Sequence, residues 1–164
     1  MKSKLPFLLV AGGLFVLAGC GKNDSGASAP ASSDSASAVV TAELTAGDNM
    51  KYNLAMIEAK PGQDVKVILT NIGSMPKQAM AHNFILLAKG TDPKAFVDAA
   101  VTAAATDYIP AAMADKIIAH TKLLGPKQTD EINFKAPKEP GEYTFLCSFP
   151  AHYLSGMKGA LVVK

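Results

Sequence analysis

The segment EYTFLCSFPAHYLSGMK, residues 142–158, decides how the rest of the chain is interpreted. Its first six residues alternate in polarity, which predicts a β-strand whose odd-numbered residues, Cys147 among them, share one face. Four residues separate Cys147 from His152, and four more separate His152 from Met157. A turn between this strand and the next can bring the thiolate, the imidazole and the thioether to one point. The segment therefore predicts a metal site with soft ligands at one end of a β-structure.

A second imidazole, His82, lies upstream in the segment MAHN (residues 80–83), just before the apolar run 84–87. Loops that are distant in the sequence meet at one end of a β-sandwich, so His82 can complete the site. Two imidazoles, one thiolate and a weak thioether match the ligand set of trigonal blue copper. Taken singly, Cys147 and Met157 are also compatible with core packing. Their spacing, together with His82, favours the metal site.

Short apolar and β-branched segments alternate with turn signals through residues 39–164, which is typical of a sandwich. Strands are predicted over residues 64–70, 84–87, 131–135, 142–147 and 159–163. The segment 93–105 differs, because Thr91-Asp92-Pro93 offers a helix start and apolar residues then recur at helical spacing. A short turn is expected near residues 111–115. The prediction is an all-β fold, a Greek-key antiparallel β-sandwich with one inserted α-helix.

The N-terminal segment differs in composition from the rest of the chain. Lys2 and Lys4 precede an apolar run that is too short to span a bilayer comfortably, and LAGC (residues 17–20) resembles a bacterial lipobox. We predict a lipoprotein signal peptide over residues 1–19, a lipidated Cys20 and a Ser/Ala-rich tether up to residue 38. The folded domain then spans residues 39–164. A plain signal peptide or a short anchor that happens to contain a cysteine is the alternative.

Composition excludes several classes of function. Hydrophobic residues make up 49% of the 164 residues and charged residues 18%, which excludes a disordered domain. Lys and Arg total 16 against 14 Asp and Glu, and every basic residue is lysine, so nucleic acid is not an expected partner. Beyond His82 and His152 only His120 remains, for which we predict a surface or structural role. That is too few histidines for the second metal site of a copper enzyme, so we do not expect an enzyme.

Four segments closely resemble azurins and the related auracyanins: MPK (75–77), MAHN (80–83), IAHTKLLG (118–125) and CSFPAHYLSGMK (147–158). The resemblance covers essentially all of residues 39–164. It implies a cupredoxin with one type 1 copper, with equatorial ligands His82, Cys147 and His152 and the long axial ligand Met157. The backbone carbonyl of Ala81 is implied as a further weak contact. The four-residue gap before Met157 is similar to auracyanin, because azurins have one residue fewer there and a glycine at the position of Ala81.

The resemblance also implies roles for residues around the ligands. Asn83 is expected to tie the ligand loops together near Ser148, and the backbone N–H groups of Asn83 and Phe149 to reach the Cys147 sulfur. An apolar patch for redox partners is implied at Met50, Met75, Met80, Phe149, Pro150, Ala151 and Leu154. Methionines suit such a patch because they adapt to several surfaces.

The function that follows is a membrane-tethered one-electron carrier that cycles copper between Cu(I) and Cu(II). Its expected partners are redox proteins, such as a c-type cytochrome or a membrane oxidoreductase, and the membrane through lipid on Cys20, with no small-molecule substrate. The expected location is the bacterial periplasmic space or cell surface. The residue after Cys20 is Gly21 and not an aspartate, which favours the outer membrane over the inner one in a bacterium with two membranes. The alternative is a copper-binding or copper-delivery lipoprotein. The ligand set separates the two, because a thiolate between two imidazoles favours a retained, redox-active ion.

Overall fold

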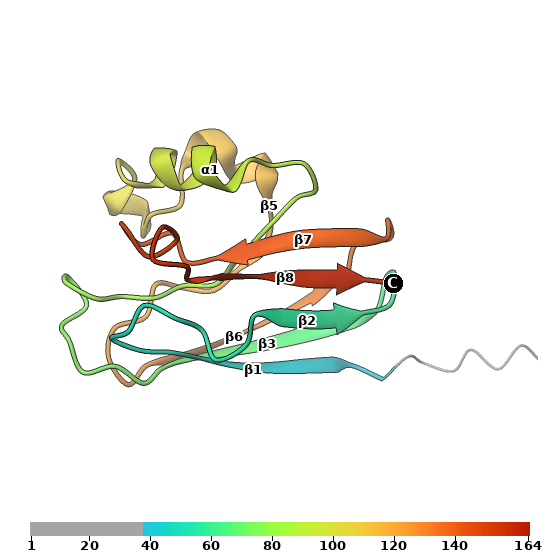
Figure 1. Cartoon of the computed structure of the whole chain (residues 1–164), viewed down its shortest axis with the longest axis horizontal. Helices are drawn as coiled ribbons and strands as arrows, with labels where there is room; N and C mark the ends of the chain where they lie inside the picture. Colours follow the sequence, from blue (N-terminus) through green and yellow to red (C-terminus); the bar gives the residue numbers. More distant parts are fainter. Residues whose placement is uncertain (1–37) are drawn as a thin grey trace, which may run out of the picture. The chain divides into compact units, whose positions relative to one another are not determined.

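The computed structural model describes residues 38–164, so the predicted signal peptide, Cys20 and all but the last residue of the predicted tether lie outside the described residues. The strands form two sheets that face each other (Figure 1). The three-stranded sheet has the order β1-β3-β6, with β1 Val40–Ala46, β3 Asp64–Asn71 and β6 Thr129–Lys135. The five-stranded sheet has the order β2-β8-β7-β4-β5, with β2 Met56–Ala59, β8 Lys158–Val163, β7 Gly141–Leu146, β4 Ile85–Leu87 and β5 Ile117–His120.

The predicted β-sandwich is confirmed, with one correction to its pairing. Two pairs of neighbouring strands, β1 with β3 and β2 with β8, run parallel, and the remaining pairs are antiparallel. The reason lies in the order of the chain. After β1 the chain crosses to the other sheet to form β2 and then returns as β3, which therefore runs in the same direction as β1 beside it.

The main core fills the space between the two sheets. In β3 the side chains of Val65, Val67 and Leu69 alternate into this core and are at most 1% exposed. Phe145 on β7 stacks on Phe84, with the ring centroids 5.1 Å apart. Burying large apolar side chains in this way supplies the main driving force for folding.

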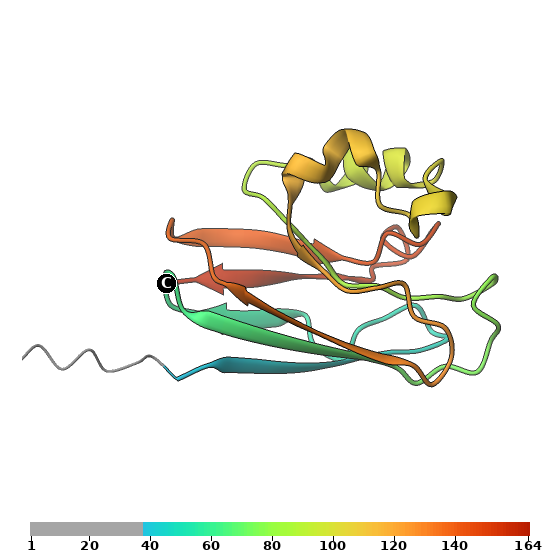
Figure 2. The same cartoon turned by 180° about the vertical axis from the view of Figure 1, so that it is seen from behind.

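A second apolar cluster covers the outer face of the five-stranded sheet. Ile85, Leu87 and Leu146 pack there against Phe96 and Val97 of the helix α1, Pro93–Ala100, so β4 is buried on both faces as predicted. Figure 2 shows α1 and the short helical turns η1, Ala104–Thr106, and η2, Ala111–Lys116, grouped above this sheet. Within residues 38–164 no helix is long and apolar enough to cross a membrane.

The inserted helix is shorter than the predicted 93–105. Asp92 caps its start through the Lys94 N–H at 2.9 Å, and Pro93 follows, as the sequence pattern indicated. The helix ends at Ala100, and Ala103 has left the helical region. Asp107 and Tyr108 then both adopt left-handed backbone angles, which redirects the chain toward the ligand loops.

The strand directions bring the sequence-predicted ligands to one end of the sandwich. β7 runs to Cys147, and β4 and β8 begin just after His82 and Met157 respectively. β1 ends at the same end of the molecule, where Ala46 is bridged to Tyr52. The opposite end holds the start of β1 and the C-terminus (Figure 1).

Candidate metal centre

His82, Cys147 and His152 come together in the structure although 64 residues lie between His82 and Cys147 in the sequence. One ligand atom from each residue lies within 4.8 Å of the other two, and all three side chains are buried. The imidazole centroids of His82 and His152 are 4.9 Å apart, and Nδ1 of His152 lies 3.4 Å from Sγ of Cys147. Within residues 38–164 this is the group of histidine, cysteine and acidic side chains arranged to hold a metal ion.

The chemistry of these donors fits a metal ion. Both ring nitrogens of His82 are buried without a hydrogen-bond partner, a costly state that a bound metal would relieve at one nitrogen. Burial lowers the pKa of the His82 imidazole and lowers that of His152 to about 4, so both rings stay neutral and keep a lone pair for coordination. Burial also raises the pKa of the Cys147 thiol to about 12, and a coordinated metal would deprotonate it.

The two predicted weak contacts flank the same site. Met157 is fully buried, its carbonyl accepts from the Cys147 N–H at 3.2 Å, and its own N–H donates to the His152 carbonyl at 2.9 Å. The Ala81 carbonyl oxygen lies 4.0 Å from Sγ of Cys147. The backbone of Met157 is thus tied to both Cys147 and His152, and the Ala81 carbonyl lies beside Cys147.

The loop between β7 and β8 folds tightly enough to return His152 to Cys147. The His152 N–H donates to the Phe149 carbonyl at 3.1 Å, which closes a turn around Pro150 and Ala151. Ala151 has a left-handed φ of 69° and Gly156 a φ of 90°. A glycine adopts such angles without strain, whereas Ala151 does so at some cost, as is common at functional sites.

Asn83 joins the His82 segment to the Cys147 loop. Its side-chain amide donates to Oγ of Ser148 at 2.9 Å, and its Oδ1 accepts from the Ser148 N–H at 2.9 Å. The backbone N–H groups of Asn83 and Phe149 lie near the Cys147 sulfur, and they partly offset the rise in the pKa of its thiol. Bonds of this kind fix the orientation of metal ligands.

The residues of the predicted partner patch differ in exposure. Leu154 is 72% exposed and Met75 is 40% exposed. Ala151 is also exposed, whereas Met50, Met80 and Pro150 are half-buried. Phe149 is buried, with its ring centroid 5.0 Å from that of Tyr108 and 4.8 Å from that of His152.

Sequence reasoning missed three residues that touch the site. Tyr52 donates its hydroxyl hydrogen to the Asn83 carbonyl, and the Asp107 carbonyl accepts from the Asn83 amide at 3.5 Å. Tyr108 packs edge-on against Phe149. Their contacts depend on the tertiary fold, and no local pattern in the sequence marks them. His120 is exposed at the end of β5, where its Nδ1 lies 3.1 Å from the Thr121 carbonyl.

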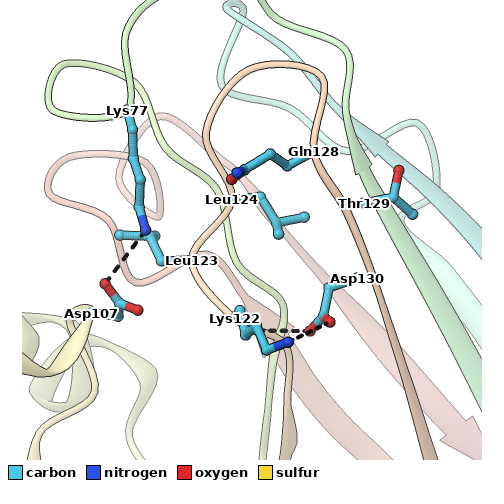
Figure 3. A pocket seen from close by; sticks show the side chains of 8 residues that line it. All are labelled: Lys77, Asp107, Lys122, Leu123, Leu124, Gln128, Thr129 and Asp130. Atoms are coloured by element: carbon cyan, nitrogen blue, oxygen red, sulfur yellow. Dashed lines mark hydrogen bonds and ion pairs between the residues drawn. The ribbon is translucent and has the colours of Figure 1, made fainter.

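A surface pocket is lined by Leu123 and Leu124, which follow β5, and by six polar or charged residues (Figure 3). Its charged side chains form two ion pairs, Lys77 with Asp107 at 3.8 Å and Lys122 with Asp130 at 3.7 Å. Leu124 also lines it and exchanges two backbone hydrogen bonds with His82, of 3.1 and 2.8 Å. The wall of this pocket therefore supports the His82 segment from outside.

Comparisons with known proteins agree with this geometry. The family model for copper binding proteins, plastocyanin/azurin family, matches residues 38–164. Azurin from Achromobacter denitrificans is 37% identical over 123 residues, which cover 73% of this chain and 81% of that protein. Outer membrane protein H.8 from Neisseria gonorrhoeae is 34% identical over 113 residues, which cover 68% of this chain and 61% of that protein.

Two solved structures have the same fold. The auracyanin from Roseiflexus castenholzii, solved in its dithionite-reduced form, has a TM-score of 0.68 at 36% identity and covers 76% of this chain and 97% of its own. Auracyanin A, a blue copper protein from Chloroflexus aurantiacus, has a TM-score of 0.67 at 31% identity and covers 77% of this chain and 100% of its own.

Proposed function

The chain belongs to the plastocyanin/azurin family of copper-binding proteins, and we propose that it is a membrane-tethered one-electron carrier. The predicted resemblance to azurins and auracyanins is thereby confirmed, and copper is the cofactor. Members of this family are electron carriers that exchange electrons with redox proteins. In our proposal His82, Cys147 and His152 would hold the copper, and Met157 would be a weaker fourth ligand.

The observation that carries this proposal is the buried cluster of two imidazoles and one thiolate. His82 and Cys147 are 0% exposed and His152 is 1% exposed, so water and small substrates are kept from the donors. Copper bound there supplies reversible one-electron chemistry. The protein would contribute a rigid cage, because the bonds of Asn83 and Met157 tie the ligand segments together.

In this proposal redox partners dock on the predicted apolar patch, which includes residues on either side of His152 in the sequence. Met75, Ala151 and Leu154 are its exposed members, and none of them carries a charge. A small apolar contact without fixed ion pairs binds weakly and releases quickly, as a shuttle between a donor and an acceptor requires. Copper delivery is less well supported, because a delivered ion must exchange and these donors are buried.

The proposed location is the periplasmic space or cell surface, with the chain anchored by lipid on Cys20 and joined to the domain by residues 21–38. The lipobox-like LAGC segment supports this, as does the similarity to a protein named for the outer membrane. Two or more acyl chains would hold the protein stably at a membrane, whereas one would hold it only marginally.

The test is a titration of the metal-free full chain, purified in mild detergent, with Cu(II), followed by visible absorption. We expect an intense blue band from charge transfer between the Cys147 thiolate and copper, bleached by a reductant and restored by an oxidant. The matched control is Cys147→Ser, which keeps a similar side-chain size and should lack the band. Copper uptake by the wild-type chain without the band would contradict the electron-carrier function.

A further inference from the structure

The loop between β1 and β2, residues 47–55, supplies none of the proposed copper ligands, yet it contacts both segments that do. We call it the bracing loop. Its Tyr52 hydroxyl reaches the segment of His82, and its Lys51 ammonium donates to the Ser155 carbonyl in the loop between His152 and Met157. A loop that touches both ligand segments can control how they sit relative to each other.

Tyr52 lies with its ring in the sandwich and its hydroxyl beside the metal centre. It is bridged to Ala46 at the end of β1, and its ring centroid is 5.7 Å from that of Phe145. The hydroxyl donates to the Asn83 carbonyl. Burial raises the pKa of this hydroxyl well above its usual range, and the charge of the nearby Cys147 thiolate adds to the shift. Tyr52 therefore remains a hydrogen-bond donor at neutral pH.

Asn83, which accepts this bond, connects the two ligand segments of the metal centre. The Asn83 N–H faces the Cys147 sulfur, and its side-chain amide is paired twice with Ser148. The Tyr52 hydroxyl donates to the backbone carbonyl of Asn83. Asn83 is thus held through its N–H, its side chain and its carbonyl. From outside the two ligand segments it is bonded by the Tyr52 hydroxyl and, at 3.5 Å, by the Asp107 carbonyl.

The bracing loop is itself held firmly enough to serve as a support. The Asp48 carboxylate accepts from the Ser74 N–H at 3.0 Å and from the Ser74 hydroxyl at 2.9 Å. Oδ1 of Asn53 accepts from the Thr45 N–H at 2.7 Å, which ties the other end of the loop to β1. Tyr52 lies between these two attachment points.

We propose that Tyr52 is a positioning residue of the copper centre, whose hydroxyl fixes the Asn83 peptide and thereby the N–H group that faces the Cys147 sulfur. This inference rests on the proposed function, because it concerns how the copper site is held. It goes beyond the ligand set, since it assigns part of the site's geometry to a loop that holds no ligand.

The test compares two full-length variants that each lose a single phenol hydroxyl. Tyr52→Phe removes the bond to Asn83, whereas Tyr153→Phe is the control, because Tyr153 makes its contact through its ring, 4.6 Å below the Lys158 ammonium. We expect Tyr52→Phe to shift the thiolate-to-copper band and to weaken Cu(II) binding about 10-fold, the lower end of what such supporting residues contribute. Tyr153→Phe should keep both at their wild-type values. A folded Tyr52→Phe with an unchanged band and affinity would overturn the proposal.

Two further measurements keep the test decisive. If Tyr52→Phe does not fold, Tyr52 is replaced site-specifically by 3-fluorotyrosine, whose more acidic hydroxyl strengthens the donated bond; a band at the wild-type position would then reject the role. The second measurement is hydrogen exchange of the Asn83 amide in the metal-free protein, which should be faster in Tyr52→Phe than in Tyr153→Phe. Equal exchange would also reject it. This readout needs no copper, so a wild-type chain without a blue band would defeat the proposed function but leave Tyr52 testable.

Discussion

The two ends of the sandwich are built on different principles. At the ligand end, non-glycine residues such as Met50, Tyr108 and Ala151 adopt left-handed angles, and the buried nitrogens of His82 lack partners. At the opposite end, the turns use glycines such as Gly62, and the charged side chains form exposed ion pairs. The left-handed residues named above and the two unpaired nitrogens of His82 thus lie at the ligand end, where a bound metal would relieve one of these nitrogens, whereas the turns and ion pairs named at the other end are of ordinary kinds.

The largest effect should come from removing the thiolate at the ligand end. In Cys147→Ser we expect the blue band to vanish and most of the stabilisation by copper to be lost. For the wild-type protein that stabilisation should be about 4 kcal/mol with free copper at a thousand times its dissociation constant. Chemical unfolding with and without Cu(II) measures it. Equal stabilisation of both proteins by copper would show that Cys147 does not hold the metal.

The next largest effect should appear as the pH is lowered in the metal-free protein. Because burial lowers the pKa of His152 to about 4, the unfolded chain binds a proton at this residue between pH 6.5 and 4 while the folded chain does not. The free energy of unfolding should therefore fall as the pH drops through this window, by about 2–3 kcal/mol. Urea unfolding at several pH values tests this, and His152→Gln should flatten the dependence. A metal-free protein equally stable at pH 4.5 and 7 would contradict it.

A smaller effect should follow when a methyl group is added at the tight contact between two loops of the ligand end. A Cβ on Gly73 would lie 2.3 Å from Oδ1 of Asp48, so Gly73→Ala must displace the carboxylate that holds Ser74. We expect a loss of about 1–2 kcal/mol in the free energy of unfolding, in the range of overpacking effects. Thermal unfolding measures it. Gly73→Ala in an Asp48→Ala background is the control, and an equal loss there would contradict the role of this contact.

The smallest effect is expected at the opposite end. Lys164 pairs with Glu58 at 2.6 Å, but both side chains are more than half exposed, at 65% and 53%. Lys164→Met should therefore change the free energy of unfolding by less than about 0.5 kcal/mol and leave the blue band unchanged. Urea unfolding and visible absorption of the same sample check both. A loss comparable to that of Gly73→Ala would break the contrast between the two ends.

The sequence pattern was most informative where side-chain periodicity alone sets the structure. The alternation in β3 and the continuous apolar run of β4 were both found, because burial on one face or on two leaves a direct trace in the sequence. The strands β1, β2 and β5 were not individually predicted, and of these β2 and β5 have only four residues, which carry little periodicity. The parallel pairing of β1 with β3 follows from a crossing between sheets and has no local signal.

The error in the helix has a local cause. The alanine-rich stretch after Val97 favours helix through residue 105, yet the chain leaves the helix after Ala100 and turns at Asp107 and Tyr108. Contacts at the metal centre fix that turn, since Tyr108 packs on Phe149. Helix propensity alone could not anticipate that tertiary contact.

The position of the chain ends has a practical consequence for work on electrodes. β1 begins and β8 ends at the end of the molecule opposite the ligand loops (Figure 1). If the protein were attached to an electrode through a group placed after Lys164, the metal centre would face the solution. About 20 Å of strand would then separate the metal centre from the electrode. An attachment at the exposed Leu154 would turn the centre toward the conductor instead. Since tunnelling falls steeply with distance, the choice of attachment point alone should switch a voltammetric response between weak and strong.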